Sequence, residues 1–89
     1  MAQSFIKDPD AVLDYTVDWE DWLDGDTIAT SSWVADTGIT VDSDTNTTTT
    51  ATAWLSSGTD GLRYEVTNSI VTAAGREDDR TIEIIVISK

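Results

Sequence analysis

A period of two in the pattern of apolar residues is the feature that most constrains how this chain folds. Between residues 12 and 19, single polar residues separate the apolar ones, which are Leu13, Tyr15, Val17 and Trp19. Successive side chains of a β-strand point to opposite faces of the sheet, so this spacing predicts a strand with one buried and one wet face. β-Branched and aromatic side chains, which fit a pleated surface, supply most of the apolar residues.

The same chemistry recurs in short segments along the chain, separated by polar turns, most of which contain glycine. These segments are residues 27–34, 39–41, 50–55, 62–72 and 80–87. Their spacing of roughly 8–12 residues is typical of two packed sheets. We therefore predict an all-β fold, an immunoglobulin/fibronectin III-like antiparallel β-sandwich of about seven short strands. The spacing of Trp19 and Trp22 suits one helical turn, and we expect no longer helix.

The limits of the domain follow from where the alternation begins. Phe5 and Ile6 join no alternating pattern, so we expect residues 1–10 to form an N-terminal arm and residues 11–89 to form the Ig-like domain. The alternation slips near Ser31 and Ser32, as it does at a β-bulge. The expected core consists of Leu13, Tyr15, Val17, Trp33, Trp54, Tyr64, Val66, Ile82, Ile84 and Val86.

The chain is strongly acidic. Its 17 Asp and Glu residues outnumber 5 Lys and Arg residues, which gives a formal net charge of −12. Phosphate backbones and anionic lipid surfaces repel such a chain, so nucleic acid and membranes are poor partners. The first residues have neither the basic start nor the apolar stretch of a signal peptide, so we expect synthesis in a cytoplasm without one.

The chain has no cysteine and no histidine. Disulfides, thiolate nucleophiles and Cys/His metal sites are therefore excluded. The residue that most often serves as a general acid or base near neutral pH is missing as well. Because a domain of this size has little room for a catalytic cleft, we expect no enzymatic activity and no cofactor.

Two sets of residues are candidates for binding. The first is a weak calcium candidate, since hard cations prefer several carboxylate oxygens on a tight loop, although its order does not match the EF-hand loop. Its members are Asp18, Glu20, Asp21, Asp24 and Asp26. The same acids would otherwise form a charged edge that blocks pairing with other sheets.

The second set is apolar and is expected to contact other proteins. From Ile84 onward the last strand is apolar on both faces, so it is either covered on both sides or docked on another chain. The expected interface residues are Phe5, Ile6, Trp19, Trp22, Ile85 and Ile87. A simpler interpretation of Trp19 and Trp22 is that they pack over the open end of the sandwich.

The stretch from Asp60 to Val66 resembles the tyrosine corner of immunoglobulin-like domains. Asp60 precedes Tyr64 by four positions, and Val66 follows it by two, where antibody domains have a cysteine. The resemblance implies that the Tyr64 hydroxyl bonds to backbone near the corner while the ring packs in the core. Gly61 lies one position earlier than in the antibody pattern.

A narrower resemblance covers nearly the whole chain. Its motifs are Lys7-Asp8-Pro9-Asp10, Leu13-Asp14-Tyr15, Val17-Asp18-Trp19, Trp22-Leu23, Gly25-Asp26-Thr27-Ile28, Trp33, Trp54-Leu55-Ser56-Ser57-Gly58, Tyr64-Glu65-Val66-Thr67-Asn68 and Thr72-Ala73-Ala74-Gly75-Arg76. In this order they resemble a family of small tailed-bacteriophage virion proteins, Ig-like in fold, of the fibre–tail adaptor or head–tail region type. The resemblance implies a non-enzymatic structural component of the virion, most simply an adaptor that joins fibres or neighbouring proteins to the tail or neck. Its partners would be other phage structural proteins of the tail, neck, fibre or capsid, together with symmetric copies of itself.

Two alternatives to the adaptor stay open at this point. A capsid decoration protein would have the same fold and charge, but it would bind heads in large numbers and stabilise them against heat. A carbohydrate-binding or calcium-dependent adhesion module would use Trp19, Trp22 and the neighbouring acids.

Overall fold

The computed structural model describes residues 3–88. Seven strands and one helical turn follow one another along this part of the chain. They are β1 (Gln3–Lys7), β2 (Leu13–Asp18), α1 (Glu20–Leu23), β3 (Ile28–Ala35), β4 (Ile39–Asn46), β5 (Thr50–Ser57), β6 (Arg63–Thr72) and β7 (Glu77–Val86). Within the described residues, no helix is long and apolar enough to cross a membrane.

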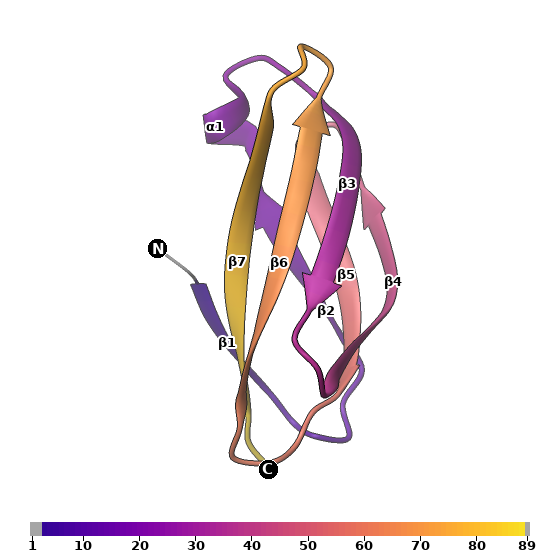
Figure 1. The fold of residues 1–89 in the computed structure, drawn as a ribbon, viewed down its shortest axis with the longest axis vertical. Helices are drawn as coiled ribbons and strands as arrows, with labels where there is room; N and C mark the ends of the chain where they lie inside the picture. Colours follow the sequence, from indigo (N-terminus) through magenta and orange to yellow (C-terminus); the bar gives the residue numbers. More distant parts are fainter. Residues whose placement is uncertain (1–2, 89) are drawn as a thin grey trace.

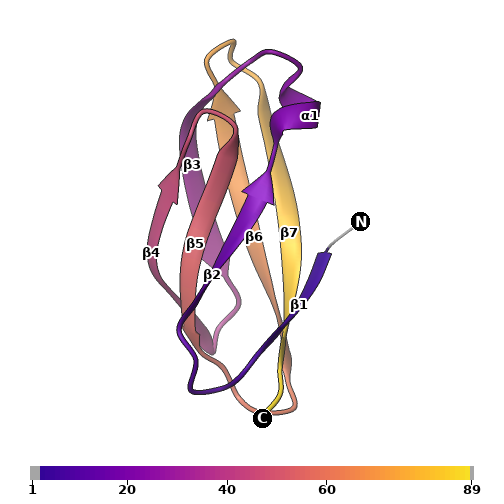
Figure 2. The same ribbon diagram turned by 180° about the vertical axis from the view of Figure 1, so that it is seen from behind.

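The strands form two sheets that pack face to face. One sheet has four strands in the order β1-β7-β6-β3, and the other has three in the order β2-β5-β4. Figure 1 shows the four-stranded sheet in front of the three-stranded one, and Figure 2 shows the same pair from behind. Every strand pair is antiparallel except β1 with β7, which run parallel. The predicted all-β sandwich is confirmed.

The strand order is that of an immunoglobulin-type sandwich. In the constant-type domain, the second, fifth and fourth strands share one sheet, and the third, sixth and seventh share the other. The strands β2, β5 and β4 and the strands β3, β6 and β7 have these neighbours here. The first strand differs, because β1 joins β7 on the opposite sheet.

The arm predicted for residues 1–10 is not separate from the domain. Residues 3–7 form β1 at the edge of the four-stranded sheet, and Met1 and Ala2 lie outside the described residues. Within β1, Phe5 and Lys7 turn inward while Ser4 and Ile6 are exposed. The sequence did not reveal the alternation of β1, because one of its inward positions is a lysine. Its pairing partner β7 also lies almost a whole chain length away.

The core lies between the sheets and contains most of the predicted residues. Tyr15, Val17, Tyr64 and Val66 are buried, as are the alternate isoleucines and valine of β7. Buried residues that were not predicted are Trp19, Leu23, Ile28, Ile39, Ala51, Ala53, Leu55 and Ile70. Each large aliphatic side chain removed from water in this way contributes roughly 1.5–3 kcal/mol to stability.

Two predicted core residues are exposed instead. Leu13 begins its strand at the end of the sandwich and is 41% exposed, and Trp54 is 42% exposed on the outer face of β5. Trp54 points outward because successive side chains of a strand alternate between the two faces, and its neighbours Ala53 and Leu55 point inward. Trp33 is partly buried and packs against the core.

Trp19 closes one end of the core through a hydrogen-bond network. Its indole N–H donates to Asn68 Oδ1 at 2.9 Å, and both residues are fully buried. The Asn68 amide in turn donates to the Ser31 hydroxyl at 2.9 Å and to the Ser32 carbonyl oxygen at 3.0 Å. The network therefore joins the entrance of α1 to β6 and β3 with its polar atoms satisfied.

The strand limits differ from prediction at three places. β4 continues to Asn46, beyond the predicted segment 39–41, and a tight turn leads from it to β5, which begins at Thr50. β7 begins at Glu77, in what was expected to be a turn. The bulge in β3 lies between Ile28 and Thr30, ahead of the predicted position.

The tyrosine corner is present as the resemblance implies. The Tyr64 ring is buried, and its hydroxyl accepts a hydrogen bond from the Thr59 N–H at 2.9 Å. Gly38 and Gly58 have positive φ and lie against this corner. A Cβ on Gly38 would lie 2.8 Å from Tyr64 Cε1, so the ring fills the space that a side chain would need.

We expect Tyr64→Phe to lower the free energy of unfolding by about 0.5–1.5 kcal/mol, because the Thr59 N–H loses its acceptor while the core keeps the ring. Tyr15→Phe is the matched control, since the Tyr15 hydroxyl is buried without a partner within the described residues. Removing that hydroxyl is expected to leave stability unchanged or slightly higher. Urea denaturation of both variants checks this, and equal losses would contradict the role given to the corner.

Candidate protein interface

Ile6, Ile85 and Ile87 form an apolar strip on the outer face of the sandwich, which we call the isoleucine surface. Ile6 of β1 lies opposite Ile85 of β7 in the parallel register. Ile87 follows two residues later, and its N–H donates to the Lys7 carbonyl oxygen at 3.0 Å, which extends the ladder. Ile6 is 54% exposed, Ile87 is 43% exposed and Ile85 is partly exposed. The pairing of β1 with β7 therefore brings together three of the predicted interface residues.

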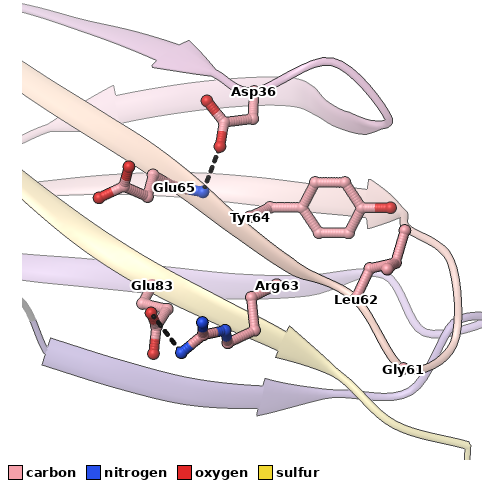
Figure 3. A pocket seen from close by; sticks show the side chains of 7 residues that line it. All are labelled: Asp36, Gly61, Leu62, Arg63, Tyr64, Glu65 and Glu83. Carbon is pink, nitrogen blue, oxygen red and sulfur yellow. Dashed lines mark hydrogen bonds and ion pairs between the residues drawn. The ribbon is translucent and has the colours of Figure 1, made fainter.

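An open depression adjoins the isoleucine surface at the same end of the molecule. Its lining residues are Asp36, Gly61, Leu62, Arg63, Tyr64, Glu65 and Glu83. Figure 3 shows Arg63 reaching from β6 toward Glu83 on β7, with a guanidinium-to-carboxylate distance of 3.6 Å. Asp36 is held differently, since it accepts a hydrogen bond from the Glu65 N–H at 2.8 Å. Arg63 lies opposite Ile85 across the strands, so a cation borders the apolar strip.

Lys7 fixes β1 beneath the isoleucine surface. Its side chain is fully buried, and its ammonium donates to the carbonyl oxygens of Asp8 at 2.9 Å and Ser57 at 2.8 Å. Burial lowers the pKa of Lys7 from its ordinary value, and the nearby carboxylates of Asp8, Asp10 and Asp42 oppose that shift. The lysine thus ties the first strand to the end of β5 with a buried, charge-assisted contact.

Phe5 and Trp19, also predicted for the interface, face the interior. Phe5 packs edge-to-face on Tyr15 with ring centroids 5.2 Å apart. Trp19 is 0% exposed, so its assignment to an interface is wrong for the folded chain, and the simpler interpretation of end packing applies. The two errors have different causes. Phe5 belongs to a strand that the sequence did not reveal, and Trp19, although it lies between Asp18 and Glu20, points into the core.

Trp22 is partly buried at the opposite end of the sandwich. The Arg76 guanidinium lies 4.3 Å from the centre of its ring and 3.2 Å from Asp26 Oδ2. Arg76 also donates to the Leu23 carbonyl oxygen at 2.7 Å, so it satisfies the end of α1. Hydrogen bonds, first from the Thr72 hydroxyl and then from Thr27 and Arg76, hold the pKa of Asp26 below its usual value. Arg76 therefore links α1 to the turn between β6 and β7.

The five acids proposed as weak calcium ligands do not converge. Within residues 3–88, no group of three or more acidic side chains is arranged to hold a metal ion. Asp26 is committed to Arg76, and Asp18 accepts a hydrogen bond from the Glu20 N–H at 3.0 Å. A helical turn directs neighbouring side chains apart, which explains why acids close in sequence fail to gather.

Sequence reasoning missed the depression and the outward position of Trp54. The residues that line the depression come from β6, β7 and the turns that follow β3 and β5. No single stretch of sequence therefore predicts it. Trp54 carried a usable signal, because Ala51, Ala53 and Leu55 alternate as inward residues around it.

The comparison with protein families adds an independent finding to this geometry. Residues 7–85 match the family described as "Podophage GP4 fiber-tail adaptor protein gp77". The chain belongs to this family. The match runs from the last residue of β1 almost to the end of β7, so the sandwich itself carries the family's shared pattern.

Membership in this family states the function at a general level. The chain is a structural fibre-tail adaptor of a bacteriophage particle and works by contact with other tail and fibre proteins. A comparison with curated proteins finds no match. The isoleucine surface and its neighbouring depression bring exposed apolar and charged side chains together at one end of the sandwich.

Proposed function

We propose that the chain acts without catalysis, as a rigid bridge in the virion whose isoleucine surface docks on one of the proteins that it joins. The observation that carries this proposal is the family match over residues 7–85. The match contains the whole sandwich apart from the start of β1 and the last residue of β7. The part of the chain that matches the family is therefore the sandwich, and we place the contact on one of its faces.

The shape and anchoring of the sandwich support a bridging role. The described chain measures 41 × 24 × 19 Å, and its strands run along the long axis. Lys7 holds β1 in place, so the isoleucine surface is preformed and loses little freedom on binding. Its composition also suits an interface, with an apolar centre formed by Ile6 and Ile85 and a charged rim at Arg63 and Glu83.

The particle's symmetry would repeat this contact. Tail machines present equivalent positions around an axis, so several copies of the chain would each dock in the same way on a partner or on a neighbouring copy. We further propose that the chain is made in the host cytoplasm and joins the particle there. Its net charge of −12 would keep free copies apart before assembly.

The decisive experiment combines genetics with a surface variant. Phage particles produced without the chain are expected to lack attached fibres in electron micrographs, and adding the purified wild-type chain is expected to restore them. Particles that keep their full set of fibres without the chain would overturn the adaptor function.

The double variant Ile6→Thr with Ile85→Thr tests the surface. We expect it to fold, since both side chains face outward on strands and threonine suits a strand. Its retention on particles lacking the chain should fall at least about ten-fold. Val34→Thr is the control, because Val34 is an exposed apolar residue on β3, away from the strip. Equal retention of the double variant and the control would refute the role of the isoleucine surface.

A further inference from the structure

The outer face of the three-stranded sheet presents a single large aromatic side chain among acids, and we call it the tryptophan face. Its members are Trp54 on β5, Asp14 and Thr16 on β2, and Asp42 and Ser43 on β4. Asp14 and Ser43 are the direct cross-strand neighbours of Trp54, one on each side. Directly opposed side chains on a sheet lie within roughly 4.5–5.5 Å at their Cβ atoms, so the acid and the indole are adjacent.

The Trp54 ring is partly open to solvent and pairs with no other ring and no cation among the described residues. It is 42% exposed at the middle of the central strand of its sheet. Among the described residues, aromatic pairs form between Phe5 and Tyr15 and between Trp19 and Trp22, and no cation lies over Trp54. An exposed aromatic ring lowers solubility, and a ring without a pair in its own chain is available to contact a partner protein.

The charge of this face is one-sided. The three strands of the sheet carry the acids Asp14, Asp18, Asp42 and Asp44 and no lysine or arginine. The base whose charge reaches Asp42 is Lys7, and its side chain is fully buried. The Asp14 carboxylate makes no hydrogen bond or ion pair within the described residues. The face therefore offers carboxylates without an exposed cation to balance them.

The same ingredients are combined with a cation elsewhere in this chain. Arg76 stacks 4.3 Å from the centre of the Trp22 ring while its guanidinium pairs with Asp26 at 3.2 Å. Arg80 stacks at 4.3 Å over Trp19. The Trp54–Asp14 pair repeats the indole and the carboxylate of the first arrangement, and among residues 3–88 no cation completes it.

The tryptophan face is also held in shape. The Thr16 and Thr52 hydroxyls hydrogen-bond across the strands at 2.9 Å, directly beside the row of Trp54. On the other side, the Ser56 hydroxyl donates to Asp42 Oδ1 at 2.9 Å and orients that carboxylate along the face. The bulge between Val41 and Ser43 places Asp42 and Ser43 next to each other at this edge.

We infer that the tryptophan face binds an arginine- or lysine-bearing segment of another virion protein, with the cation stacked on Trp54 and paired with Asp14 and Asp42. This inference rests on the proposed adaptor function and adds a second contact to it. The isoleucine surface belongs to the four-stranded sheet and the tryptophan face to the other, so the two contacts lie on opposite faces of the sandwich. One face is apolar with a charged rim and the other is acidic with an aromatic centre, which allows two different partners.

The test uses particles lacking the chain, to which purified full-length variants are added. We expect Trp54→Thr and the double variant Asp14→Asn with Asp42→Asn each to lower retention at least about ten-fold. Both changes lie on an exposed face, so folding is expected to persist, and circular dichroism confirms it. The control for the acids is Glu77→Gln, which removes an exposed carboxylate from the other sheet. The control for the tryptophan is Val34→Thr.

Salt provides a second readout. Raising the salt concentration should weaken retention of the wild type more than that of the Asp14/Asp42 double variant, because screening acts on the charges that the variant lacks. Equal retention of Trp54→Thr, the aspartate variant and their controls would overturn the inference. Failure of the wild-type chain itself to bind the particles would instead overturn the adaptor function, so the two failures are distinguishable. Loss of binding in Trp54→Thr with no change in the aspartate variant would also reject a cationic partner.

Discussion

Replacement of Trp19 by alanine is expected to lower the free energy of unfolding by about 3–5 kcal/mol, the largest single effect in this molecule. The side chain is fully buried, so its removal leaves a cavity at one end of the core. It also leaves Asn68 Oδ1 buried without the indole N–H that it accepts, and it removes the ring over which Arg80 lies. Domains of this size are stable by about 5–15 kcal/mol, so the variant should be close to unfolding at moderate temperature.

Urea denaturation followed by circular dichroism measures this effect. Trp54→Ala is the matched control, because it removes the same side chain from an exposed position and is expected to cost less than about 1 kcal/mol. Trp19→Phe separates the two contributions, since it keeps most of the ring but leaves Asn68 without its donor, for an expected loss of about 1–3 kcal/mol. Similar losses in the free energy of unfolding for Trp19→Ala and Trp54→Ala would show that the buried hydrogen-bond network of Trp19 adds no stability.

Gly58→Ala is expected to cost about 2–5 kcal/mol, through two separate causes, backbone strain and a steric contact. Gly58 has a φ of 99°, a conformation that an L-residue with a side chain adopts only with strain. A Cβ at this position would also lie 2.7 Å from Val86 Cγ2, which is fully buried in the core. Overpacking of a buried contact typically costs about 1–3 kcal/mol in addition to the backbone strain.

Gly61→Ala in the same turn measures backbone strain alone, so the difference between the two variants gives the contribution of the steric contact. Gly61 has a similar φ of 86°, but a Cβ there would meet no atom within 4 Å. The control should therefore lose only the contribution of backbone strain, about 1–2 kcal/mol. Thermal and urea denaturation of both variants give the comparison. If Gly61→Ala destabilised the chain as much as Gly58→Ala, the contact with Val86 would have no part in the effect.

The alternation of apolar and polar residues was enough to predict the sandwich, and seven of the ten residues predicted for its core are buried. Trp54 was assigned to the core because it lies in a strand with apolar neighbours. The fully buried residues of that strand are Ala51, Ala53 and Leu55, which share the inward face, so Trp54 faces outward. In a strand the parity of a position decides its face, and a large side chain at an outward position remains outside.

The first strand could not be predicted because its partner is remote. Gln3 lies beside Ile82 and Lys7 beside Val86, and local sequence carries no record of such a pairing. Lys7 is a further obstacle, since a lysine is rarely fully buried and here becomes so only by donating to two backbone carbonyls. The isoleucine surface depends on that pairing, so its residues were predicted one by one but their arrangement was not.

The parallel ladder between β1 and β7 determines how the adaptor would respond to mechanical load. β1 begins at Gln3 beside Ile82, whereas β7 ends at Val86 beside Lys7, at the other end of the ladder. A force that draws the two chain ends apart would slide the strands along each other instead of peeling them open. All hydrogen bonds of the ladder, and the buried Lys7 contacts beside them, would resist that sliding together. A force applied along this ladder would thus load all of these contacts at the same time.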